Sequence, residues 1–404
     1  MSEPMTGSQL SDQQGRAGAR ASVASGRMHH VDAARALFLL LGIPFHVGMI
    51  AVFNRAPAVP GFKQAGAIVF SLTFIHAFRM FAFFMLSGYF AAMVREKRGK
   101  RPWLEDRLTR LGFPLVGSLF TLGVLQHFFH QELLGETPGG IHGLPLAFDH
   151  LWFLCVLLAF VGTFYLVPVE RLPAAGSRWG KAIGDALCLS GKGWLSFLVL
   201  LALWSLGQGA LEDVLPRQRA FEIDLLWQYL MHAPAFAIGV LAFRLRVGER
   251  LFDLPGSRLP LLAAALFPLY LMLAPLMRPV LGLSRGLSAE WNFIGNLIEL
   301  PTALVLSLLA LRLLARVADR PSRTVSFLVD GAMAIYLFHM IFVIVTVAWL
   351  PHLPLIPEIQ WLAGSALVLL LSLAAFLAVR GNAVLALIYC GKPIAPREPA
   401  AAPA

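Results

Sequence analysis

Long apolar runs follow one another along almost the entire chain, separated by short polar segments. A helix rises 1.5 Å per residue, so about 20 apolar residues cross the hydrocarbon core of a bilayer. The sequence has about ten runs near that length. They lie at roughly 36–53, 67–94, 108–130, 151–169, 194–209, 225–243, 259–277, 290–315, 325–350 and 360–389. The pattern predicts an all-α, polytopic membrane protein with about ten transmembrane helices in one bundle.

Composition and cysteine usage support this class. The 404 residues are 58% hydrophobic and 14% charged, which excludes an ordinary soluble domain. The net charge of +10 does not indicate nucleic acid as a partner, because the basic residues separate apolar runs rather than covering a water-soluble surface. The three cysteines, Cys155, Cys188 and Cys390, lie far apart and without metal-ligand spacing. We therefore expect no disulfide and no metal site.

The distribution of positive charge predicts the orientation. Twenty-five of the 33 Lys and Arg residues fall in the termini and alternate connections on one side, six fall on the other, and Arg35 and Arg79 lie within helices. Because basic residues accumulate in cytoplasmic loops, both termini are predicted to be cytoplasmic. We expect a disordered cytoplasmic tail over 1–28, a transmembrane domain over 29–393 and a second cytoplasmic tail over 394–404.

The first apolar run carries two polar residues on one face. Arg35 and His46 are eleven residues apart, which places them on the same side of a helix and about 16 Å apart along its axis. His46 is therefore expected near the membrane midplane. Pro44, two residues earlier, removes a backbone hydrogen bond and is expected to kink the helix beside the histidine.

Three other runs bring ionisable residues to a similar depth. They are His76 with Arg79, Glu299, and His339. Because buried ionisable groups are costly in a membrane, the set predicts a central polar cavity and substrate-binding roles for these residues. Two structural explanations remain open: a histidine can serve only as an interhelical hydrogen-bond partner, and Arg79 can be a structural charge paired with Glu299.

Other candidate residues lie nearer the membrane surfaces. Tyr89, His150 and Trp152 are candidates for substrate binding, although Tyr89 and Trp152 also fit the interfacial aromatic belt. Arg107 and Arg110 belong to the densest basic segment and can hold the phosphates of a cytosolic nucleotide-like donor. Contact with anionic lipid headgroups explains the same residues equally. The sequence contains no Walker or GxGxxG motif.

Several segments resemble the membrane acyltransferase 3 superfamily, whose first helix carries an Asp, an Arg and, after ten intervening residues, a catalytic His. Asp32, Arg35 and His46 match this pattern. Within the superfamily, the chain is similar to the group that acts in glucan biosynthesis, although Met340 and Ile341 after His339 depart from relatives with further polar character. The shared segments are VDAARALFLLLGIPFH (31–46), FIHAFRMFAFFMLSGYF (74–90), HLWFL (150–154), AIYLFH (334–339) and GKP (391–393).

The resemblance implies a multi-pass acyltransferase of the bacterial inner membrane. Its expected reaction moves a succinyl group from cytosolic succinyl-CoA to hydroxyls of osmoregulated periplasmic glucans. Acyl-CoA is then a co-substrate, and no tightly bound cofactor is expected. The periplasmic glucan and membrane lipids are the other expected partners, and glucan-synthesis proteins or a second copy of the chain are candidates.

The resemblance also suggests roles for individual residues. His46 is expected to act as a general base, or to be acylated itself. Arg35 is expected to bind the donor or orient Asp32. Together with His46, these two residues form the expected catalytic set. Arg79 is expected to hold the acyl carboxylate or to stabilise the oxyanion.

Three other functions fit the sequence. Acetyl transfer to another envelope polysaccharide fits the same residues. A proton-coupled transporter also places charges at the midplane, but the sequence shows no internal repeat. A noncatalytic scaffold in glucan synthesis would not require His46.

Overall fold

A computed structural model describes residues 28–53, 61–135, 144–214, 225–252, 258–283 and 289–391. Within these ranges the chain forms helices and no strand, which confirms the all-α class. The predicted tails, 1–28 and 394–404, lie outside the described residues, except for residue 28.

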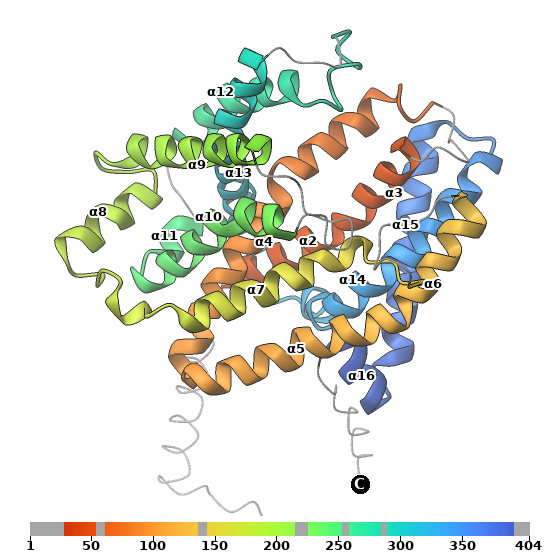
Figure 1. Cartoon of the computed structure of the whole chain (residues 1–404), viewed down its shortest axis with the longest axis horizontal. Helices are drawn as coiled ribbons and strands as arrows, with labels where there is room; N and C mark the ends of the chain where they lie inside the picture. Colours follow the sequence, from red (N-terminus) through yellow and green to blue (C-terminus); the bar gives the residue numbers. More distant parts are fainter. Residues whose placement is uncertain are drawn as a thin grey trace, which may run out of the picture.

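The helices are arranged around the long central helix α4 (Figure 1). In chain order they are α2 (His29–Leu40), α3 (Gly42–Phe53), α4 (Gly66–Arg98), α5 (Lys100–Phe120), α6 (Leu122–Phe129), α7 (Trp152–Leu166), α8 (Arg178–Leu187), α9 (Trp194–Val214), α10 (Leu225–Arg244), α11 (Gly248–Phe252), α12 (Arg258–Leu273), α13 (Ala289–Val317), α14 (Arg323–Trp349), α15 (Pro357–Val379) and α16 (Ala383–Cys390).

The described helices identify a multi-pass membrane protein. Seven spans are long and apolar enough to cross a membrane, and an eighth is added if the pair Lys100–Phe120 and Leu122–Leu134, bent by 41°, counts as one. The sequence analysis predicted about ten. The two remaining apolar runs form the shorter helices α7 and α12, which do not meet the length of a full span.

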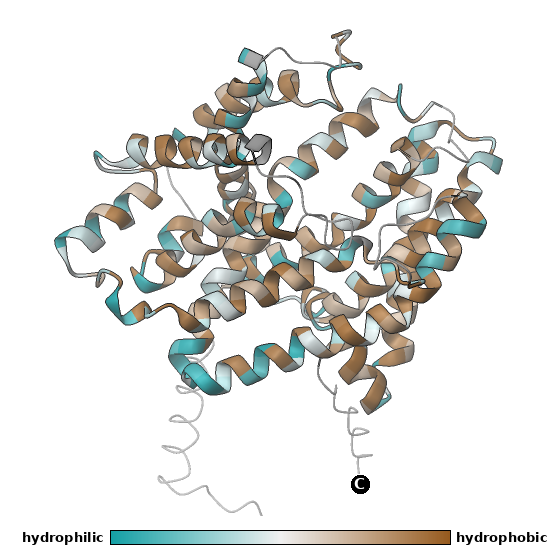
Figure 2. Cartoon of the chain, in the orientation of Figure 1, coloured by the Kyte–Doolittle hydropathy of each residue, from teal (hydrophilic) through white to brown (hydrophobic). Residues whose placement is uncertain are grey.

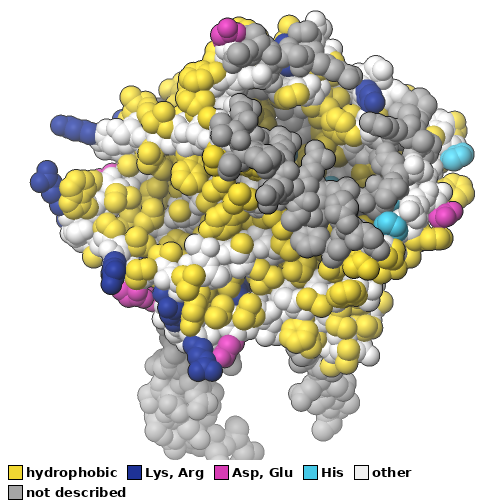
Figure 3. All heavy atoms as spheres, in the orientation of Figure 1, with side chains coloured by type: hydrophobic (Ala, Val, Ile, Leu, Met, Phe, Trp, Pro, Cys, Tyr) yellow, Lys and Arg dark blue, Asp and Glu magenta, His cyan; other side chains and the backbone are white. Residues whose placement is uncertain are grey.

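The outer surface matches this assignment. Hydrophobic residues dominate the helices (Figure 2). Hydrophobic side chains also cover much of the face shown in Figure 3, and Lys and Arg side chains gather toward its edge. Large apolar side chains are strongly exposed, among them Leu166 at 76%, Leu200 at 66% and Val317 at 78%. Such exposure is unfavourable in water but favourable in lipid.

The first membrane-spanning segment is interrupted near its proline. Helix α2 ends at Leu40 and α3 begins at Gly42. Pro44 cannot donate a backbone hydrogen bond to Leu40, so the ladder is weakened where the sequence predicts a kink. The Trp361 indole N–H of α15 donates a 2.8 Å hydrogen bond to the Pro44 carbonyl, which fixes α3 from the side.

Glycines allow α4 and α10 to approach closely. A Cβ added at Gly239 would overlap the carbonyl oxygen of Met85, and one added at Gly88 would overlap the carbonyl oxygen of Phe236. Small residues let helix backbones touch in this way inside membranes. The contact fixes α10 against the second half of α4, beyond the candidate site residues His76 and Arg79.

Replacing Gly239 with Leu is expected to destabilise the protein strongly. The added side chain meets backbone atoms, which cannot move aside as a side chain can, so the cost should exceed the about 1–3 kcal/mol of ordinary overpacking. Thermal unfolding of the purified protein in detergent measures the effect. Gly207→Leu on α9 is the matched control, because nothing lies within 4 Å of a Cβ at that position. Equal melting temperatures for the two variants would contradict the close α4–α10 contact.

Candidate active site

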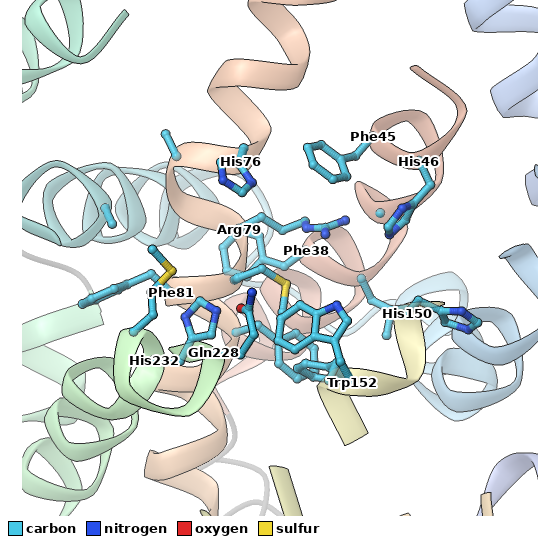
Figure 4. A pocket seen from close by; sticks show the side chains of 18 of the residues that line it. Phe38, Phe45, His46, His76, Arg79, Phe81, His150, Trp152, Gln228 and His232 are labelled. Atoms are coloured by element: carbon cyan, nitrogen blue, oxygen red, sulfur yellow. The ribbon is translucent and has the colours of Figure 1, made fainter. Parts of the chain in front are cut away.

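A cavity of about 440 Å³ lies inside the bundle, where α3, α4, α7, α10, α13 and α14 meet (Figure 4). Its volume falls in the range of small-molecule sites. The polar residues that line it are His46, His76, Arg79, His150, Gln228, His232, Tyr270, Glu299, Tyr336 and His339. The four helices expected to contribute polar residues at one depth therefore do share one cavity.

Three histidine rings form a cluster along one wall of the cavity. The ring centroids of His46 and His339 are 5.3 Å apart, and those of His339 and His150 are 5.2 Å apart. His339 and His150 are only 3% and 4% exposed. Three helices thus bring three proton-carrying groups into direct proximity.

A backbone hydrogen bond fixes the orientation of His339. Its Nδ1 lies 2.5 Å from the carbonyl oxygen of Tyr336, one turn earlier on α14, and must carry the proton for this contact to be a hydrogen bond. The Nε2 atom is then an acceptor, and it is buried without a partner among the described residues. The Tyr336 hydroxyl donates to the carbonyl oxygen of His150, which ties α14 to the start of α7.

Arg79 brings a buried positive charge into the cavity. Its guanidinium lies 4.8 Å from the centroid of the Phe45 ring, and the residue is 9% exposed. Gly42 gives it room, because a Cβ at that position would lie 2.7 Å from Nη1. Phe45 also stacks on His76, with centroids 5.7 Å apart and planes inclined by 7°. Arg79 is therefore held by aromatic and backbone contacts.

The structure does not pair Arg79 with Glu299. Both residues line the cavity, but in the described part of the chain no salt bridge or hydrogen bond joins them or gives either another charged partner. The guanidinium is thus available to an anionic group in the cavity. The structural ion pair considered from the sequence is not formed.

Helix α10 contributes two residues that the sequence analysis missed, Gln228 and His232. The His232 ring stacks between Trp152, 6.0 Å away by centroid, and Phe84, 4.5 Å away. Gln228 lies one turn earlier and lines the same cavity (Figure 4). The signal was present, since His232 is an ionisable residue inside an apolar run, the criterion that selected His76 and His339.

Tyr89 is not brought to the cavity. Its ring packs edge-on against Phe243 and Phe252, with centroids 5.5 and 5.1 Å apart, and it fills the space left by Gly248. Aromatic packing accounts for its position. Its suggested substrate-binding role has no support from the geometry.

Asp32, Arg35, Arg107 and Arg110 form a separate charged group at the basic end of the bundle. The Asp106 carboxylate forms ion pairs with three guanidinium groups, those of Arg110 at 3.0 Å, Arg98 at 3.2 Å and Arg107 at 3.6 Å. Arg35 lies 3.7 Å from Asp32, and it acts electrostatically on Arg107. The group holds more arginines than carboxylates, so it offers net positive charge. One helical turn separates Arg35 from Phe38, which lines the cavity.

The described residues contain no group of three or more His, Cys, Asp and Glu side chains placed to hold a metal ion. The three histidine rings of the cluster lie in contact with one another along the cavity wall. Imidazole groups near neutral pH can both accept and donate a proton, which suits acyl transfer to a hydroxyl.

Fold and cavity together define a multi-pass membrane protein with a buried histidine and arginine site. Residues 28–379 match the acyltransferase domain family, and the chain belongs to that family. The predicted family is confirmed. No solved structure matches the chain.

Relatives that the chain matches over nearly their full length come from Shigella and Escherichia coli. The chain is 26% identical over 403 residues to glucans biosynthesis protein C of Shigella dysenteriae, of Shigella boydii and of Escherichia coli strain K12. Each alignment covers 94% of this chain and 98% of the relative. The similarity thus extends over the cavity and the basic end alike.

Proposed function

We propose that this protein is a transmembrane O-acyltransferase that moves a succinyl group from cytosolic succinyl-CoA to hydroxyls of a periplasmic glucan. The observation that carries the proposal is the contact of His46 with His339 beside an unpaired Arg79, in a chain of the acyltransferase family. The names of the relatives support a glucan as the acceptor. The proposal includes a location in a bacterial inner membrane, with both termini cytoplasmic.

His46 acts as the general base in this reaction. A glucosyl hydroxyl oxygen attacks the thioester carbonyl carbon while the His46 imidazole takes the hydroxyl proton. The C–S bond then breaks, and the imidazolium returns the proton to the departing CoA thiolate. An ester and free CoA are formed, and the protein is unchanged.

His339 supports His46 in the same step. Its fixed tautomer leaves Nε2 unprotonated, and its ring centroid lies 5.3 Å from that of His46. An acceptor at this position favours a single orientation of the His46 ring, as the orienting partner does in other His-based sites. Transfer through an acyl-His46 intermediate uses the same groups, and a mass increase on the protein incubated with donor alone would identify it.

The two positively charged regions bind different parts of the donor. Arg79 holds the succinyl carboxylate, because guanidinium and carboxylate form paired, charge-assisted hydrogen bonds. Arg35, Arg107 and Arg110 hold the phosphates of CoA at the basic end. The donor then approaches the cavity from the cytoplasm, and neither substrate crosses the membrane whole.

Mass analysis of periplasmic glucan tests this function. Cells that contain the protein are expected to show a succinyl mass increment on the glucan, and cells without it are not. An acetyl increment would identify a different acyl donor. Unchanged glucan, together with net flux of a substrate through proteoliposomes, would replace the proposal with a transporter.

A further inference from the structure

A second cavity of about 370 Å³ adjoins the first on the side of α12 and α13. Five residues line both cavities, so the two are arms of one space. These junction residues are Phe45, Met49, His76, Tyr270 and Glu299. The other residues that line the second arm take no part in the proposed chemistry at His46.

A polar stripe on α13 runs along this arm. Asn292, Asn296 and Glu299 are spaced by four and three residues, so they lie on one face of the helix. Asn292 is exposed, whereas Asn296 and Glu299 are partly buried, so the stripe leads from the surface to the junction. Each position along it presents a hydrogen-bonding group.

These three side chains have no hydrogen-bond partner among the described residues. Leaving a polar group unpaired away from water costs about 1–3 kcal/mol. Asn292 is open to solvent, whereas Asn296 and Glu299 are partly enclosed by the apolar side chains of the arm, so a ligand, with water, completes the hydrogen bonds at the inner end of the stripe.

The charges of the two arms differ. In the described lining, the second arm contains no Lys or Arg, and Glu299 is its carboxylate. Arg79 lines the first arm only. An anionic acyl chain or a phosphate is favoured beside Arg79 and disfavoured along the Glu299 stripe. A neutral, hydroxyl-rich molecule fits the second arm, because amides and a carboxylate bind hydroxyls.

We infer that the second arm binds the acceptor sugar, with Asn292, Asn296 and Glu299 hydrogen-bonding its hydroxyls and Tyr270 lining its path. This inference rests on the proposed function and deepens it. At the junction, Phe45 adjoins the His46 ring, with centroids 5.3 Å apart. A hydroxyl that passes Glu299 and Phe45 therefore reaches the base.

Calorimetric binding of a glucose trisaccharide to the purified protein in detergent, without donor, tests the inference. Asn296→Leu and Glu299→Leu are each expected to weaken binding about tenfold, the effect of losing one or two hydrogen bonds. Gln131→Leu is the matched control: it removes an exposed amide that lines neither arm and should leave the trisaccharide affinity unchanged. Melting temperatures exclude misfolding, and Asn292→Leu at the exposed end of the stripe provides a second test.

The outcomes separate the inference from the proposed function. Weakened sugar binding in the stripe variants supports the inference even if no acyl transfer is found. Unchanged binding in the stripe variants, equal weakening in Gln131→Leu, or no binding to the wild type overturns it. In a transfer assay, Asn296→Leu should raise the KM for the acceptor and leave the KM for the donor unchanged; the reverse would also overturn the inference.

Discussion

His46→Ala is expected to abolish acyl transfer while the protein still folds and inserts. A positioned general base contributes about 10²–10⁴-fold in rate, and a nucleophile contributes more. His46 is only partly buried, so the truncation does not open a large hole in a packed core. Transfer of labelled acyl groups from succinyl-CoA to glucan, measured in membranes with equal protein content, gives the rate.

The matched control for this change is His352→Ala. His352 is an exposed histidine whose ring contacts Trp349 outside the cavity, so its loss should leave the rate unaltered. Full activity of the His46 variant would remove this residue from the mechanism and leave His339 or His150 as the base.

Arg79→Leu is expected to lower kcat/KM for succinyl-CoA by about 10–100-fold. Hydrogen bonds to a charged group contribute about 1.5–3 kcal/mol, and each 1.4 kcal/mol is a factor of ten. The variant retains an apolar stem beside Phe45 but loses the charge in the cavity. Steady-state transfer rates with succinyl-CoA and acetyl-CoA, measured side by side, report the loss.

Acetyl-CoA distinguishes the two roles of Arg79, because it lacks the terminal carboxylate. If the guanidinium holds that carboxylate, the variant loses rate only with succinyl-CoA, and Arg79→Lys recovers part of it by restoring the charge. Equal losses with both donors would instead assign Arg79 to the oxyanion of the transition state.

The sequence predicts which helices carry buried polar residues better than it predicts the direction in which each side chain points. His46, Arg79, Glu299 and His339 were identified because an ionisable residue in an apolar run is visible in one dimension, and the helical rise converts its position into depth. Direction around the helix depends on how neighbours pack. Tyr89 illustrates this limit, since it shares α4 with Arg79 but packs toward Phe243 and Phe252.

His150 was expected near a membrane surface for a related reason. The apolar run that follows it was treated as a full span, which would put its first residues at the membrane surface. Helix α7 has only 15 residues, and the turn before it, Asp149–Leu151, brings the His150 ring against His339. A short helix of this kind is stabilised by tertiary contacts that no local pattern records.

The shared junction of the two cavities allows substrate preferences to change independently. Residues that line only one arm can vary without moving the five junction residues or the histidine cluster. With the proposed division of donor and acceptor between the arms, a substitution near Arg79 is expected to change the preferred acyl group, and a substitution along α13 is expected to change the preferred sugar. One scaffold can in this way evolve many donor and acceptor combinations around a constant reaction centre.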